Sequence, residues 1–154
     1  MGYNVSDIIE KTIKIAVRRR AIYENIGQEK SDNLPIQILS KVLEKQMDKT
    51  ILYYETLLKE VNEVEFEEID FSTYDKMSSL ISDFNNRLNT IEICCSREFL
   101  EFSLGLEKAV YSLLMDIQGR LVKNTDDIHT KTYKLLSNII QNKARQIEMI
   151  EGML

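Results

Sequence analysis

Apolar residues recur at spacings of three and four along most of this chain, the pattern of helices that bury one face. Four long segments show it, over residues 8–27, 36–61, 97–121 and 132–154, and a shorter one covers 73–88. Alternation of apolar and polar residues, which would indicate strands, is absent from the sequence. The pattern therefore predicts an all-α protein. Polar residues suited to helix starts precede these segments: Ser6 or Asp7, Asp32 or Asn33, Ser72, Ser96, and Thr125 or Asp126.

The chain also resembles itself. "LSKVLEKQMDKTI" (39–51) aligns without gaps on "LSNIIQNKARQIE" (136–148), and "RRAIY" (19–23) aligns on "EKAVY" (107–111). Because the aligned segments come in the same order in both halves, the sequence predicts a duplicated helical hairpin. Two hairpins give four helices that share one core, so we expect a four-helix bundle. The predicted single domain, 1–154, comprises a first hairpin (6–60), a long crossover with a short extra helix (61–95) and a second hairpin (96–154).

Composition narrows the classes of function. The chain has 154 residues, of which 29% are charged, and a formal net charge of −5. A net acidic chain lacks the basic face that nucleic-acid binding needs, so we expect no nucleic-acid partner. No apolar signal core and no apolar stretch of about 18 residues occurs, so we expect no membrane partner. The two adjacent cysteines, Cys94 and Cys95, form no disulfide framework, which favours a cytoplasmic setting.

Two charged residues, Arg19 and Glu107, interrupt the predicted apolar faces. On a helix, the residues three and four positions away share a face. Around Arg19 these are apolar or aromatic: Ile15, Ala16, Ile22 and Tyr23. Around Glu107 they are Ser103, Leu104, Val110 and Tyr111. The duplication aligns the two charges, so both are either long side chains that reach water from the edge of the face, or members of an internal ion pair or network.

The segments "IIEKTIKIAVRRRAIY" and "FLEFSLGLEKAVYSLL", each followed by a helix of the "LSKVLEKQM" type, resemble the ferritin-like superfamily, and rubrerythrin-like proteins most closely. The resemblance covers nearly the whole chain apart from the crossover at 61–95. It implies a four-helix bundle with a long crossover between the second and third helices. It also implies a non-haem di-iron centre, held by a Glu from the first and third helices and by Glu-x-x-His from the second and fourth.

Carried onto this sequence, the resemblance implies a degenerate metal site. Only Glu44 and Glu107 keep a ligating residue of the right kind, and the other equivalent positions hold Arg19, Met47, Gln141 and Ala144. Met and Ala cannot replace imidazoles, an amide is a poor substitute for a carboxylate, and a guanidinium repels a dication. We therefore expect no di-iron centre and no cofactor. We expect instead that Arg19 bridges Glu107 and Glu44 in a structural ion network, with the register of Arg19 against Glu44 left open by the short loop between their helices.

The functional prediction is a rubrerythrin-like or ferritin-like bundle that has lost di-iron binding and acts as a non-catalytic binding or structural protein, as a homodimer. We expect it not to be an enzyme. The alternative is a functional ferritin-like di-iron oxidoreductase that handles peroxide or iron at an atypical site drawn from Glu24, Glu44, Glu107 and Glu148. A third interpretation is a helical adaptor whose exposed apolar patch docks a helix of a protein partner.

Overall fold

The chain folds into five α-helices and one short 3-10 helix in a computed structural model that describes residues 2–154. Within these residues the only extended pairing is an isolated bridge between Tyr3 and Ile69. The predicted all-α class is confirmed. The helices are α1 (Val5–Glu29), α2 (Leu34–Glu63), α3 (Phe71–Arg87), α4 (Ser96–Arg120), η1 (Thr125–His129) and α5 (Lys131–Met153).

The first three helices begin at caps that the sequence identified only in part. Asn33 caps α2, as one of its two predicted candidates. The caps of α1 and α3 are Asn4 and Asp70 instead, so the predicted caps Ser6 and Ser72 lie inside these helices. Each true cap lies two residues earlier and carries a side-chain oxygen that accepts a backbone N–H of the first turn.

The last two long helices start less conventionally. Cys95 occupies the N-cap of α4 without a side-chain hydrogen bond, and Ser96 is the first helical residue rather than the cap. The predicted start of the final helix at 125 or 126 falls in η1, and α5 itself begins after its cap, Thr130. Glu67, from the crossover, accepts the backbone N–H of Thr132 at 3.0 Å. A carboxylate from a distant segment therefore stabilises the N-terminus of α5, where the helix dipole favours negative charge.

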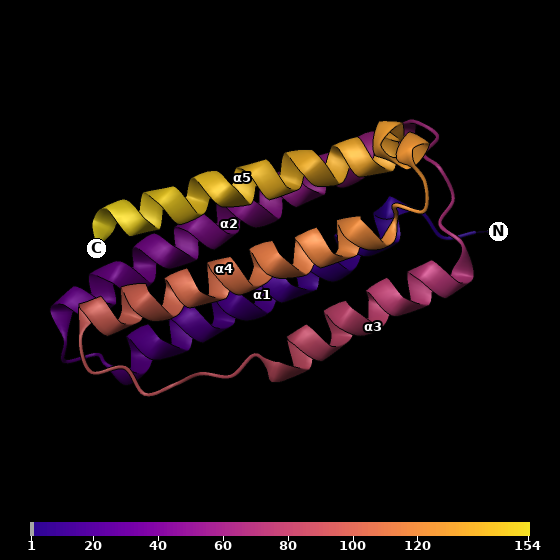
Figure 1. The fold of residues 1–154 in the computed structure, drawn as a ribbon. Helices are drawn as coiled ribbons and strands as arrows, with labels where there is room; N and C mark the ends of the chain where they lie inside the picture. Colours follow the sequence, from indigo (N-terminus) through magenta and orange to yellow (C-terminus); the bar gives the residue numbers. More distant parts are fainter. Residues whose placement is uncertain (1) are drawn as a thin grey trace.

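The helices pack as two neighbouring pairs, with α3 along one side (Figure 1). Helix α1 packs against α2, α4 packs against α5, and α3 contacts both α1 and α4. Figure 1 shows that α3 starts at the end of the bundle where α2 stops and carries the chain back along the bundle. Lys30, after α1, then lies with its Nζ 4.0 Å from Oε1 of Glu92, just before α4. The crossover thus spans the bundle and makes α4 run in the same direction as α2.

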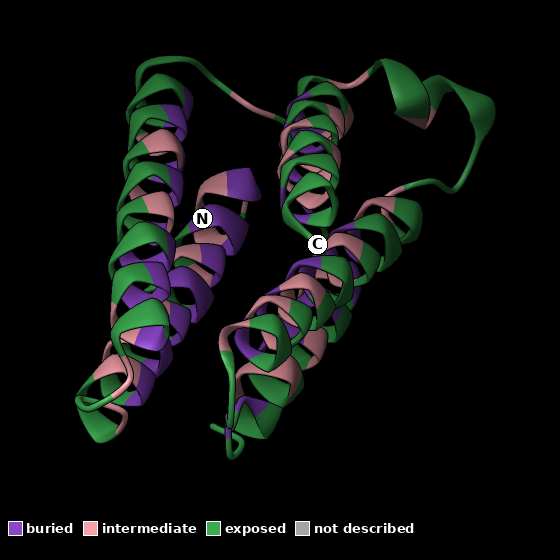
Figure 2. Cartoon of the chain, turned by 90° about the vertical axis from the view of Figure 1, so that its left-hand side faces the viewer, coloured by how far each residue is buried: buried purple, intermediate pink, exposed green. Residues whose placement is uncertain are grey.

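Buried residues lie on the helix faces turned toward one another, as the colouring of Figure 2 shows. They form one apolar cluster to which all five α-helices contribute. Two aromatic members, Tyr23 of α1 and Phe99 of α4, are fully buried, with ring centroids 5.8 Å apart. Of the helices in residues 2–154, none combines the length and apolar character that crossing a membrane requires. Against this apolar background four charged side chains are also buried: Arg19, Glu44, Glu107 and Lys143.

Gly27 allows α1 and α2 to approach closely near their connecting loop. A β-carbon at this position would lie 2.7 Å from Cβ of Ser40 on α2, and closer still to its hydroxyl. We expect Gly27→Ala to lower the free energy of unfolding by about 1–2 kcal/mol, because the two helices must move apart. Urea unfolding followed by circular dichroism measures this change.

Gly105→Ala, in α4, is the matched control. An added β-carbon at Gly105 meets no atom within 4 Å. Removing a glycine from an exposed helix interior raises the free energy of unfolding by up to about 1 kcal/mol. A similar gain for Gly27→Ala would contradict the close approach of α1 to α2.

Candidate functional site

A buried cluster of three charged side chains joins three helices near their midpoints. Arg19 of α1 donates a hydrogen bond from Nη2 to Oε1 of Glu107 of α4 at 2.6 Å. Lys143 of α5 places Nζ 2.8 Å from Oε2 of the same carboxylate. The three residues are only 1–2% exposed. We call Arg19, Glu107 and Lys143 the central ion cluster; it connects the α1–α2 pair to the α4–α5 pair.

The guanidinium of Arg19 is held from its own helix as well. Its Nη2 donates to the hydroxyl of Tyr23, one turn further along α1, at 2.8 Å. The Tyr23 oxygen lies 3.1 Å from Oγ of Ser103 on α4, and its own proton is available for that contact because the oxygen already accepts from Arg19. Nε of Arg19 is buried without a hydrogen-bond partner. The contacts therefore fix the end of the guanidinium that faces Glu107.

Lys143 is linked in turn to α2. Its Nζ donates to Oε1 of Gln146 at 3.0 Å, and Nε2 of Gln146 donates to Oγ1 of Thr50 on α2 at 3.2 Å. A buried ammonium needs an acceptor and a counter-charge. Gln146 accepts one of its protons, and Oε2 of Glu107, which has no hydrogen-bond partner among the described residues, supplies the opposite charge. Through this chain of contacts all four long helices of the bundle meet at one level.

Burial and charge act in opposite directions on these groups. Burial alone would raise the pKa of Glu107, but the charges of Arg19 and Lys143 outweigh it and hold this pKa below its usual value. Burial likewise would lower the pKa of Arg19, and contact with Tyr23 and Glu107 raises it instead. Lys143 differs: burial, aided by the charge of Arg19, lowers its pKa to about 8 despite the attraction of Glu107. With all three ionised, the cluster carries two positive charges and one negative charge.

The arrangement favours a structural role over metal ligation. Each carboxylate oxygen of Glu107 already faces a cation, so a metal ion would have to displace both Arg19 and Lys143 to bind there. A guanidinium stays protonated and cannot ligate a metal, whereas it suits a buried carboxylate well. The geometry therefore provides an ionic crosslink between helices.

Glu44 does not contact Arg19 among the interactions that the structure describes, which corrects the prediction of a bridge to both carboxylates. Glu44 accepts a hydrogen bond from Ser40 at 3.0 Å and pairs with Lys41 at 3.7 Å and with Arg20 at 3.9 Å. Arg20 follows Arg19 in α1 and so points about 100° further around the helix. The register that the sequence left open thus turns Arg20, and not Arg19, toward Glu44.

The other positions that correspond to metal ligands in the resemblance, Met47 on α2 and Gln141 and Ala144 on α5, do not join the central ion cluster. Met47 is 1% exposed and packs in the apolar core. Gln141 is exposed and Ala144 is half-buried, so neither is the residue that α5 brings to the centre. That residue is Lys143, which the sequence analysis missed. Its signal was present: Lys143 continues the apolar stripe of Leu136, Ile139 and Ile150 at helical spacing.

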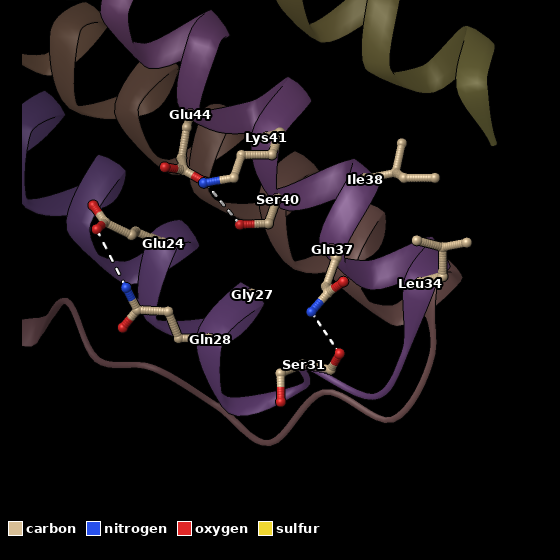
Figure 3. Close-up of a pocket in the computed structure, with 10 residues that line it drawn as sticks. All are labelled: Glu24, Gly27, Gln28, Ser31, Leu34, Gln37, Ile38, Ser40, Lys41 and Glu44. Carbon is tan, nitrogen blue, oxygen red and sulfur yellow. Dashed lines mark hydrogen bonds and ion pairs between the residues drawn. The ribbon is translucent and has the colours of Figure 1, made fainter.

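A cleft of about 530 Å³ opens where α1 ends and α2 begins (Figure 3). Figure 3 shows Glu24 and Gln28 of α1 on one side and Glu44 and Lys41 of α2 on the other. Arg20 pairs with Glu24 at 3.1 Å and approaches Glu44, so both acids of the cleft already have a cationic partner. Two further members of the alternative metal site lie elsewhere: Glu107 in the central ion cluster and Glu148 exposed on α5.

Within residues 2–154 no group of three or more His, Cys, Asp or Glu side chains is arranged so that it could hold a metal ion. No protein-family model, curated protein or solved structure matches the chain. The internal sequence repeat and the central ion cluster are accordingly the features from which a function can be inferred.

Proposed function

We propose that this chain is a ferritin-like helical bundle in which the central ion cluster takes the structural place of metal ions, and that it acts as a non-catalytic binding or structural protein. Three features support the ferritin-like relationship. The sequence repeats a helical hairpin, α1 pairs with α2 and α4 with α5, and the crossover between the pairs spans the bundle. The repeat also aligns Arg19 with Glu107, which meet in the core.

The observation that carries the proposal is the environment of Glu107. This carboxylate is 1% exposed and lies between two cations, one on each of its oxygens. Arg19 and Lys143 together supply two positive charges, the charge of one divalent metal ion. A buried carboxylate is costly without such compensation, so the two side chains can hold the helices together where a metal ion would otherwise do so.

A non-catalytic role is favoured by the isolation of this centre. All three charged groups are buried, and none of them lines the cleft beside Glu44. A catalytic group has to reach a substrate, and these groups are engaged with one another instead. The proposal includes a cytoplasmic setting, in keeping with the free thiols of Cys94 and Cys95, and a homodimeric assembly.

Metal analysis tests this proposal directly. Protein purified from iron-supplemented cells and measured by inductively coupled plasma mass spectrometry is expected to hold far less than one iron per chain, because Glu107 is fully engaged. Stoichiometric iron that is lost in Glu107→Ala and retained in Glu101→Ala, an exposed site on the same helix, would overturn the proposal. It would establish the alternative, a ferritin-like di-iron oxidoreductase.

A further inference from the structure

One face of α2 is exposed along most of the helix and carries an ordered series of charges. Six of its residues follow one another at spacings of three or four, so they share a face, and all are exposed: Lys45, Lys49, Leu52, Thr56, Glu60 and Glu63. We call these residues the α2 stripe. Ile38 and Val42 extend it toward the N-terminus of the helix at the same spacing and are 58% and 46% exposed.

The charges of the α2 stripe are divided between its two halves. Both lysines lie in the first half and both glutamates in the second, and none of the four forms an ion pair among the described residues. Glu60 and Glu63 also lie in the last turn of α2, which contains no basic residue. Negative charge is unfavourable at a helix C-terminus because of the helix dipole. No ion pair within the described chain thus involves these four charges.

We propose that the α2 stripe is the contact between two copies of this chain, which pack antiparallel about a two-fold axis. The midpoint of positions 49 and 60 is 54.5 and that of 45 and 63 is 54, so one axis near residue 54 pairs both lysines with both glutamates of the other copy. A two-fold axis perpendicular to two antiparallel helices brings the same face of each helix into the contact, so that position 49 of one copy meets position 60 of the other and the reverse. The dimer then contains four lysine–glutamate pairs, two between positions 49 and 60 and two between positions 45 and 63.

The apolar members of this face fit the same arrangement. Leu52 is 65% exposed and lies next to the proposed axis. In the proposed dimer it packs beside Thr56 of the second copy. Ile38 and Val42 then reach past Glu63 of the second copy, toward the crossover whose Val64 is 50% exposed. With 30 residues, α2 is about 45 Å long, long enough for these apolar contacts to flank the charged pairs. The partner best matched to the face, in charge and in apolar character, is therefore a second copy.

This contact specifies the homodimer of the proposed function and does not depend on how the centre of the bundle is held. None of the residues in the α2 stripe belongs to the central ion cluster. A monomeric protein would remove the contact and leave the proposal about Glu107 untouched, and iron at Glu107 would leave the contact untouched.

Charge-swapped variants test the contact by sedimentation equilibrium. The wild type is expected to have twice the chain mass of 18.0 kDa at low ionic strength. K45E/K49E makes the stripe acidic throughout and E60K/E63K makes it basic throughout, so each alone is expected to dimerise at least about tenfold more weakly. An equimolar mixture restores all four pairs, two of them with the charges exchanged, and is expected to form a heterodimer. The control is K14E/K76E, two exposed lysines on α1 and α3, which retains wild-type association.

Leu52→Asp provides a second, independent variant, because it places two like charges beside the axis and is expected to be monomeric. Circular dichroism checks that each variant keeps its helices. A wild type that is monomeric at all concentrations would overturn the proposal. So would dimers that persist in K45E/K49E or L52D, or two swapped variants that are monomeric alone and remain so when mixed.

Discussion

Glu107→Ala is expected to lower the free energy of unfolding by about 3–5 kcal/mol, because it breaks a buried ion network by removing one partner. The substitution removes the only anion of the central ion cluster. Lys143, whose pKa is already lowered to about 8, can release its proton, but the guanidinium of Arg19 stays charged and is left in the core without a counter-ion. Urea or thermal unfolding monitored by circular dichroism measures the loss, which approaches the whole stability of an ordinary domain.

The matched control is Glu101→Ala, two turns earlier on α4. Glu101 also pairs with an arginine, Arg97 at 3.2 Å, but both side chains are more than half exposed. An exposed pair of this kind contributes at most about 1 kcal/mol, so the control should unfold almost as the wild type does. If Glu107→Ala and Glu101→Ala cost the same, Glu107 would not be desolvated as the structure shows.

A triple variant measures the net contribution of the whole cluster to the free energy of unfolding, which differs from the destabilisation caused by removing one charge. Arg19→Met, Glu107→Leu and Lys143→Met together replace all three charges by apolar side chains of comparable length. Such replacements of buried ion networks are commonly neutral or stabilising, because no group remains unpaired. A triple variant as stable as the wild type, beside a strongly destabilised Glu107→Ala, would show that the cluster matters through mutual compensation and not through net attraction.

The sequence predicted two of the three members of the central ion cluster, Arg19 and Glu107, from the residues that neighbour each of them on its own helix. Arg19 has only apolar or aromatic neighbours three and four positions away, and the same is nearly true of Glu107. Helical spacing alone therefore indicates that both side chains point into the core. The contact between them follows from the bundle, since two buried opposite charges at equivalent positions of the repeat have few other partners.

The sequence did not predict Lys143 as a member of the cluster, because the internal repeat pointed to a different residue of α5. The ungapped alignment places Gln141 opposite Glu44, which drew attention to a residue that the structure leaves exposed. Alignment with the first hairpin reports ancestry, whereas burial depends on the apolar stripe of α5 itself. That stripe passes through Lys143, and the spacing test that singled out Arg19 singles out this lysine as well.

Which arginine pairs with Glu44 depends on the rotation of α1 about its own axis relative to α2, and the spacing of residues within one helix does not specify this rotation. Arg19 and Arg20 differ by one position, so a rotation of α1 against α2 by about 100° decides which of them faces Glu44. Close packing at Gly27 against Ser40 fixes that rotation, and it turns Arg20 toward the carboxylate. Helix class, helix number and approximate bounds follow from periodicity, whereas the rotation of one helix against another follows from such contacts.

Lys143 should make the protein more stable as the pH rises from about 8 to about 10. Its pKa in the folded chain is about 8, against an ordinary value of 10.5. Between these values the unfolded chain binds one proton more than the folded chain, so the free energy of unfolding increases with pH. The expected gain at pH 10 is about 2–3 kcal/mol. Above pH 10 the trend reverses, because burial raises the pKa of Tyr53 and Tyr54, and only the unfolded chain then loses their protons.

Lys143→Met isolates this contribution. The variant retains the pair of Arg19 with Glu107, whose opposite charges balance, and it has no ammonium to lose, so the rise between pH 8 and 10 should disappear. Lys134→Met, an exposed lysine on the same helix, should keep the rise in full. The measurement is a set of urea unfolding curves at half-unit steps from pH 7 to 10.5 for the three proteins. A wild type whose stability stays flat or falls over this range, in parallel with Lys143→Met, would mean that Lys143 keeps an ordinary pKa and is hydrated in solution. The central ion cluster would then be a pair, and its charge would already be balanced by Arg19 and Glu107 alone.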